Sequence, residues 1–144
     1  MLGFELKALS DQIAQIREDA IKNLSALVQL FGEEWFTEMI MPTINEAARR
    51  MGPAGYLGRI TACSAVGQLC TVLSPGLLVD NLIPQILVPL VKDKVVNVRI
   101  AAAEALVSCG VKLGDTDGDG AIGRALSQLR SDTDNDVIVA VGRR

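Results

Sequence analysis

A segment that starts with an aliphatic residue and an arginine, and ends with a glycine, occurs twice in this chain. The first copy covers residues 16–32 and the second covers residues 98–114, so both are 17 residues long. Their arginines, Arg17 and Arg99, each follow an aspartate by six residues, Asp11 and Asp93 respectively. Self-similarity of this kind is typical of stacked helical repeats, in which each unit contacts only its neighbours. This internal repeat restricts the possible folds more than any other feature of the sequence.

A third copy lies between the other two. Arg17, Arg59 and Arg99 are separated by 42 and 40 residues. Small or apolar residues follow each arginine at offsets of three, seven and ten, which lie along one face of a helix. We therefore predict that the second helices of three helical pairs share a common buried face. The residues of this face are Ala20, Leu24 and Leu27 in the first copy, Ala62, Val66 and Leu69 in the second, and Ala102, Leu106 and Cys109 in the third.

The first helices of two pairs each contain a proline at the same position. Pro42 lies in Ile-Met-Pro-Thr-Ile and Pro84 lies in Leu-Ile-Pro-Gln-Ile. A proline inside a helix removes a hydrogen bond and bends the helix. The predicted fold is all-α, an α-α superhelix of about three full helical pairs with incomplete ends, in one domain of residues 1–144. The predicted helices cover residues 4–9, 18–31, 34–50, 56–73, 77–92, 97–113, 121–130 and 134–142, and the predicted repeats cover residues 1–32, 33–74, 75–114 and 115–144.

The composition argues against an enzyme and against nucleic-acid binding. The chain has no histidine, which removes the commonest general base and a common metal ligand. Its net charge is −3, whereas a nucleic-acid-binding surface needs a basic face. The longest apolar stretches are too short or too interrupted to span a bilayer, and no signal peptide is visible. We therefore expect no catalytic residue, no cofactor and no membrane association, in a protein of the cytoplasm and, as a second location, the nucleus.

Cys63, Cys70 and Cys109 form no C-x-x-C pair. In the register of the repeat they fall where other copies have aliphatic residues. Free cysteine is among the most buried residue types, and disulfides are rare in reducing compartments. The favoured interpretation is therefore three buried, reduced thiols, and a redox or metal-binding role is the alternative.

Asp11, Asp93 and Asp132 share a position shortly before the second helices. An aspartate there accepts hydrogen bonds from the first backbone N–H groups of a helix, which stabilises the helix by about 1 kcal/mol. Where an arginine follows six residues later, an ion pair is also expected, Asp11 with Arg17 and Asp93 with Arg99. We predict that these four residues form a structural ladder that ties successive repeats together.

The acidic segment 115–122 has the form of the first part of an EF-hand calcium loop. Asp115, Asp117 and Asp119 stand at the first three ligand positions, and Gly120 stands where that loop has its invariant glycine. The last ligand position, which needs a bidentate glutamate, is Leu126. The favoured interpretation is an acidic connection built from turn-forming residues. Weak calcium binding by the three aspartates is the alternative.

Helical pairs of about 40 residues that carry a proline in the first helix and the pattern D-x-x-x-x-V-R before the second resemble HEAT repeats. Residues 93–99, Asp-Lys-Val-Val-Asn-Val-Arg, are close to the usual form of that pattern. The resemblance narrows at residues 16–35, at Met-Ile-Met-Pro (39–42) and at Gly-Tyr-Leu-Gly-Arg (55–59). These segments look like the C-terminal repeats of the scaffolding A subunit of protein phosphatase 2A, and the similarity covers residues 11–141.

The resemblance implies a non-catalytic scaffold that binds the catalytic subunit of protein phosphatase 2A. In that family the turns between the two helices of each repeat make the contacts, which correspond here to residues 11–15, 53–59, 94–97 and 133–136. Carried over by position, the expected contact residues are Tyr56, Arg59, Val95 and Asn97. Tyrosine and arginine are enriched at interface hot spots.

Three points stay open at this stage. The family commonly has proline where this chain has Lys94 and a basic residue where it has Ile138, and the resemblance stops inside the last repeat. A fragment of a longer scaffold and a truncated paralogue are therefore both consistent with the sequence. A general HEAT-type adaptor with another partner, combined with weak calcium binding at residues 115–122, is the alternative function. Uncapped ends of a repeat array expose apolar surface, so we also expect either self-association or marginal stability.

Overall fold

The regular structure in the described part of the chain is entirely helical. The computed structural model describes residues 14–52, 55–114 and 120–142, with the side chains of residues 14–20 excepted. Most of the predicted helices are confirmed to within a few residues, whereas the predicted helix 4–9 lies outside the described residues. The elements are α2 (Ala14–Phe31), α3 (Glu33–Trp35), η1 (Phe36–Ile40), α4 (Met41–Ala48), α5 (Tyr56–Leu69), α6 (Pro75–Leu77), η3 (Leu78–Leu87), α7 (Val88–Leu90), α8 (Val96–Leu113), α9 (Ala121–Arg130) and α10 (Asn135–Val141), where η marks π-helical geometry.

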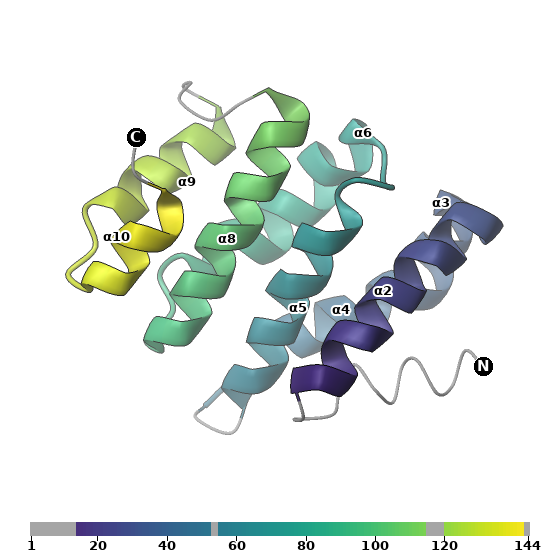
Figure 1. Cartoon of the computed structure of the whole chain (residues 1–144), viewed down its shortest axis with the longest axis horizontal. Coiled ribbons are helices and arrows are strands. Elements are labelled where there is room, and N and C mark those ends of the chain that lie inside the picture. Colours follow the sequence, from purple (N-terminus) through teal and green to yellow (C-terminus); the bar gives the residue numbers. More distant parts are fainter. Residues whose placement is uncertain (1–13, 53–54, 115–119, 143–144) are drawn as a thin grey trace.

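The helices form two layers that follow the order of the chain. Helices α2, α5, α8 and α10 lie side by side in one layer, each in contact with the next (Figure 1). Helix α4 packs on α5, η3 packs on both α5 and α8, and α9 packs on α8 and α10, which places these elements in the second layer. None of the helices in the described residues is long and apolar enough to cross a membrane.

Two glycines end the long helices of the repeated segment, as the sequence predicts. Gly32, with φ of 94°, follows α2 and donates its N–H to Val28 (2.8 Å). Gly114, with φ of 72°, ends α8 and donates its N–H to Gly110. Side chains rarely tolerate positive φ, so glycine is the residue that can end a helix in this way.

The two matched prolines lie in or beside π-helical turns. Residues 36–40 are π-helical immediately before Pro42, and residues 78–87 are π-helical around Pro84. In these stretches the hydrogen bonds reach back five residues, as from Met41 N–H to the carbonyl of Phe36. Proline lacks an N–H and its ring clashes with the carbonyl four residues earlier. The wider turn of a π-bulge accommodates both effects without ending the helix.

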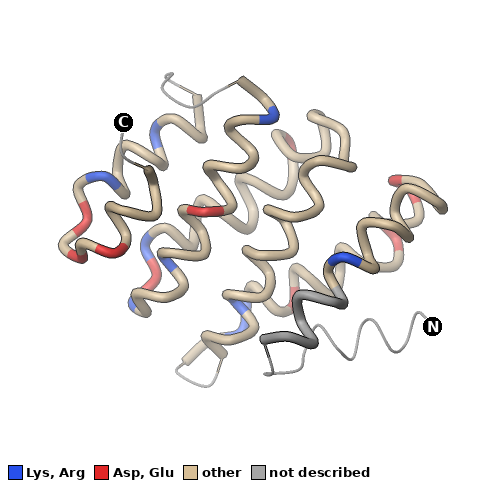
Figure 2. The backbone as a smooth tube through the Cα atoms, in the orientation of Figure 1, with Lys and Arg blue, Asp and Glu red and all other residues tan. Residues whose placement is uncertain are grey.

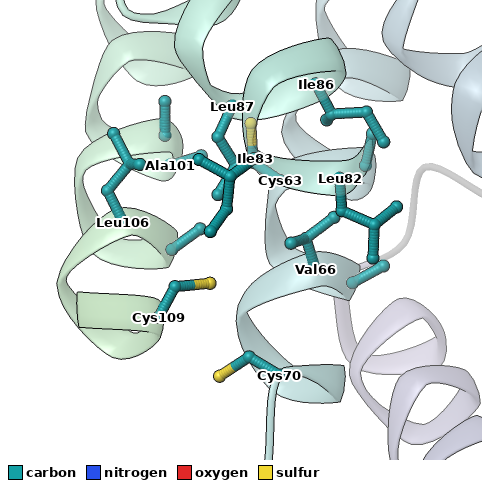
Figure 3. Close-up of a cluster of buried hydrophobic side chains, with 14 of the residues drawn as sticks. Cys63, Val66, Cys70, Leu82, Ile83, Ile86, Leu87, Ala101, Leu106 and Cys109 are labelled. Atoms are coloured by element: carbon teal, nitrogen blue, oxygen red, sulfur yellow. The ribbon is translucent and has the colours of Figure 1, made fainter. Parts of the chain in front are cut away.

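Small residues let the helices of the first layer approach closely. The predicted common face is buried wherever its side chains are described, although Leu27 is only partly covered. One close approach is between Gly67 on α5 and Ala105 on α8. A Cβ atom added to Gly67 would lie 3.2 Å from Ala105 Cα and 3.3 Å from Ala105 Cβ. Leu82, Ile83, Ile86 and Leu87 of η3 fill the space between the layers (Figure 3).

Candidate protein-interaction surface

One edge of the molecule is formed by the turns that precede α5, α8 and α10, and a buried ion pair ties the first two of these helices together. Arg59, near the start of α5, donates from Nε to Asp93 Oδ2 (2.7 Å) and from Nη2 to Asp93 Oδ1 (3.3 Å). Its third nitrogen, Nη1, donates to the carbonyls of Arg50 and Gly52 in its own turn. Asp93 also accepts the N–H of Val95 (2.9 Å). The Asp93 carboxylate therefore binds Arg59 of the preceding helical pair and also stabilises the turn that contains Asp93 itself.

The same arrangement is repeated one pair later. Arg99 donates from Nε to Asp132 Oδ2 (2.9 Å) and from Nη2 to Asp132 Oδ1 (3.2 Å). Its Nη1 donates to the main-chain carbonyl of Asp93 (2.8 Å), and Asp132 accepts the N–H of Asp134 (2.8 Å). Asp93 thus receives Arg59 on its side chain and Arg99 on its backbone, which makes the two ion pairs one continuous chain of contacts. We call Arg59–Asp93 and Arg99–Asp132 the ladder.

The ladder fixes the charge state of Asp132. Burial by itself would raise the pKa of this carboxyl group. Hydrogen bonds from the backbone N–H groups of Asp134 and Thr133 and from the Arg99 side chain, together with the charge of Arg99, outweigh burial and hold the pKa of Asp132 below its ordinary value. Charged partners and hydrogen bonds to the ionised form both favour a carboxylate.

The ladder differs from the prediction in its register. The sequence suggested that an aspartate pairs with the arginine six residues later, whereas each arginine pairs with the aspartate of the following turn, 34 residues on for Arg59 and 33 for Arg99. The carboxylates of Asp93 and Asp132 accept the N–H two residues later instead of capping the helix itself. The residue that caps α10 is Asp134, which accepts the N–H of Asp136 (2.8 Å).

The structure does not show whether the predicted pair Asp11–Arg17 forms. Asp11 lies outside the described residues. Arg17 belongs to α2, but its side chain is not among those described.

The structure corrects the role expected for Arg59. This residue is only 7% exposed and its guanidinium group is fully engaged by the ladder and by two carbonyl groups. A partner could reach it only by breaking these contacts, so Arg59 is a structural residue of the turn. Tyr56 and Val95 are half-buried and pack against the core, and Asn97 is exposed. Of the four expected contact residues, Asn97 is therefore the most available.

Charged side chains on this edge are sorted by sign along the chain. The turn before α5 carries exposed Arg49 and Arg50, and the turn before α8 carries exposed Lys92 and Lys94. The turn before α10 is acidic, with Asp132, Asp134 and Asp136 in one short segment. Figure 2 shows the change from basic to acidic along this side of the molecule. We call this edge, residues 49–52, 55–59, 92–97 and 131–136, the turn ridge.

The opposite edge carries two further ties that sequence reasoning missed. Lys112, at the end of α8, donates from Nζ to the carbonyls of Cys70 and Leu73 at the end of α5. Glu33 accepts the N–H (2.9 Å) and the hydroxyl (2.7 Å) of Ser74. Both ties join residues about one repeat apart in sequence. A comparison of residues one repeat apart could therefore have identified the contact between Glu33 and Ser74. The contacts of Lys112 are with backbone carbonyl groups, which every residue has, so the sequence does not reveal them.

Apolar side chains are exposed at both ends of the first layer. Leu30, Phe31 and Met39 are exposed near the end of α2 and in η1, and Val139 is exposed on α10. Trp35 packs on Phe31 with a ring-centroid distance of 5.3 Å. Self-association through these surfaces stays a prediction.

The calcium hypothesis falls on residues that the structure does not describe. Asp115, Asp117 and Asp119 all lie in the gap between residues 114 and 120. Among the described residues, no group of three or more metal-ligating side chains could hold an ion.

No protein-family model matches the chain. No curated protein matches its sequence.

Proposed function

We propose that this chain is a non-catalytic HEAT-type scaffold that binds a partner protein with its turn ridge. The ladder is the observation that carries this proposal. It repeats the same contact between successive helical pairs, at a spacing of 33 or 34 residues, and it aligns their turns along one edge. Repetition of a nearest-neighbour contact is the structural principle of an α-solenoid, and such arrays present extended surfaces to partners.

The partner proposed first is the catalytic subunit of protein phosphatase 2A. This proposal comes from the resemblance of residues 16–35, 39–42 and 55–59, and the turn ridge provides accessible groups where that resemblance implies contacts. Tyr56 offers part of an aromatic ring, Lys94 a charge and Asn97 an exposed amide. Tyrosine can supply a large contact area at an interface hot spot.

A binding experiment with matched variants tests this proposal. The purified chain is titrated with purified phosphatase catalytic subunit, and the affinity is measured by calorimetry or by surface-based kinetics. We expect Tyr56→Ala combined with Asn97→Ala to weaken binding at least tenfold, which corresponds to about 1.4 kcal/mol. Gln85→Ala, an exposed change in the second layer, serves as the control. Wild-type chain that fails to bind at micromolar concentration would refute this partner.

The burial of Arg59 favours a second candidate, a HEAT-type adaptor with a different partner. Because Arg59 is engaged in the ladder, one of the residues carried over from the phosphatase scaffold is not available in the way the resemblance implies. The basic side chains at Arg49, Arg50, Lys92 and Lys94 then suggest a partner with an acidic surface. Such a partner would bind more weakly as salt is raised. The phosphatase titration distinguishes the two candidates, since only the first requires that subunit.

A further inference from the structure

Two of the three buried cysteines lie on the facing helices α5 and α8, near a close contact between them. Cys70 ends α5 and Cys109 lies on α8. They follow Gly67 and Ala105, which approach each other closely, by three and four positions, which is about one helical turn. Figure 3 shows both side chains at the same end of the buried cluster, on the two facing helices. The helix crossing therefore brings these thiols together, although they are 39 residues apart in sequence.

The thiols of Cys70 and Cys109 lie close enough to shift each other's pKa. Cys70 donates its own thiol hydrogen to the carbonyl of Gly67 (3.0 Å). Lys112 holds this end of α8 against the end of α5 through its two carbonyl contacts. The two sulfur atoms are therefore neighbours across the contact between α5 and α8, and a disulfide requires them to approach to a bond length of about 2.05 Å.

Cys70 is the more reactive of the two. The hydrogen bond from Cys109 lowers the pKa of Cys70 most, burial raises it, and the charge of Lys112 lowers it further, to about 7. The same hydrogen bond, together with burial, raises the pKa of Cys109. Burial raises the pKa of Cys63 to about 12. Since the thiolate is the nucleophile, Cys70 is the cysteine that an oxidant attacks first.

Cys70 borders a surface groove. Cys70 lines a groove of about 900 Å³ between α2, α5 and α8, together with Thr71, Ser108 and Val111. The side chain itself is 1% exposed, so a small oxidant such as a peroxide reaches it more easily than a bulky disulfide.

We propose that Cys70 and Cys109 form a reversible disulfide between α5 and α8 when the protein meets hydrogen peroxide. This links two successive helical pairs covalently at the edge opposite the turn ridge.

The reaction has two steps. The Cys70 thiolate attacks one peroxide oxygen, the O–O bond breaks, and the departing hydroxide takes up a proton to leave as water, which gives a sulfenic acid on Cys70. The Cys109 sulfur then attacks the Cys70 sulfur, the S–O bond breaks, and a second water leaves with the Cys109 proton. Overall, two thiols are oxidised by two electrons and one hydrogen peroxide is reduced to two waters. A dithiol reagent reverses the change by thiol–disulfide exchange.

The test uses the folded, reduced full chain. It is treated with hydrogen peroxide, the remaining thiols are alkylated after unfolding, and the peptides are analysed by mass spectrometry. We expect one cross-linked peptide joining residues 70 and 109, alkylation of Cys63 alone, and a melting temperature higher by roughly 5–15 °C that returns to its starting value after reduction. A folded wild-type chain in which Cys70 and Cys109 both stay alkylatable would overturn the proposal.

Variants assign the order of attack. Cys63→Ser is the matched control and should form the same cross-link. In Cys109→Ser, a sulfenic-acid probe such as dimedone should label Cys70, and in Cys70→Ser the same probe should leave Cys109 unlabelled. Labelling of Cys109 in Cys70→Ser, or cross-links that include Cys63 to a similar extent, would contradict the proposal. If a serine variant does not fold, dimedone labelling of the wild-type chain at Cys70 provides the same information.

Discussion

Replacing Asp93 by alanine should strongly destabilise the protein. The Asp93 carboxylate accepts two hydrogen bonds from Arg59 and one from the N–H of Val95. The side chains of Arg59 and Asp93 are only 8% and 10% exposed, so water replaces the lost partner poorly. Removing one member of a buried pair typically costs about 3–5 kcal/mol. Because Nη1 of Arg59 keeps its two carbonyl partners, we expect the lower end, about 3 kcal/mol, out of a total stability of about 5–15 kcal/mol.

Urea unfolding followed by circular dichroism measures this change in the free energy of unfolding. Glu104→Ala is the control, because Glu104 is an exposed acidic residue on α8 and should shift stability by less than about 0.5 kcal/mol. A double-mutant cycle with Arg59→Met isolates the ion pair, and the double variant should be more stable than the two single losses added together imply. The reasoning is refuted if Asp93→Ala costs less than about 1 kcal/mol, or if the cycle shows no coupling.

Three further changes probe the other contacts. Gly67→Val should destabilise the chain by about 1–3 kcal/mol, measured by thermal unfolding, because the valine side chain would overlap Ala105. Gly76→Ala is the control, since open space surrounds Gly76, and it should be neutral or slightly stabilising in the same measurement. Lys112→Met should cost about 1–3 kcal/mol in urea unfolding, since two carbonyl groups at the end of α5 lose their donor. The pKa of Asp132 is lowered in the folded state, so its contribution is complete above the unfolded pKa of about 4 and is lost as the pH falls through the folded pKa. Asp132→Asn should therefore weaken the dependence of stability on pH in this acidic range, and an unchanged profile would contradict the assignment.

The helices could be predicted because their signals are local. The offsets of three, seven and ten after Arg17, Arg59 and Arg99 report one helical face, and Gly32 and Gly114 end helices through their own backbone conformation. These features depend on a few neighbouring residues.

The ladder pairing could not be predicted in the same way, because it depends on how the helical pairs stack. An arginine one turn into a helix can reach an aspartate in the turn before its own helix or one in the turn of the next pair. The spacing of six residues in the sequence suggests the first aspartate, whereas the structure has the second. The constant spacing of 33 or 34 residues to the following aspartate is visible only when the pairs are compared with each other. The burial of Arg59 in the ladder could not be predicted for the same reason. A residue type that is common at interfaces is also the type that a buried ion pair requires.

The ladder makes some helices of the first layer harder to separate than others. It needs a carboxylate in each receiving turn, and residues 49–55, which precede α5, contain neither aspartate nor glutamate. The joints between α5 and α8 and between α8 and α10 each have an ion pair. The turn before α5 has no acid that could receive an arginine of α2 in the same way, and the described tie nearest to α2 is the pair of hydrogen bonds between Glu33 and Ser74. Local opening starts where the contacts are weakest. We therefore expect α2 to separate more readily than α5, α8 and α10.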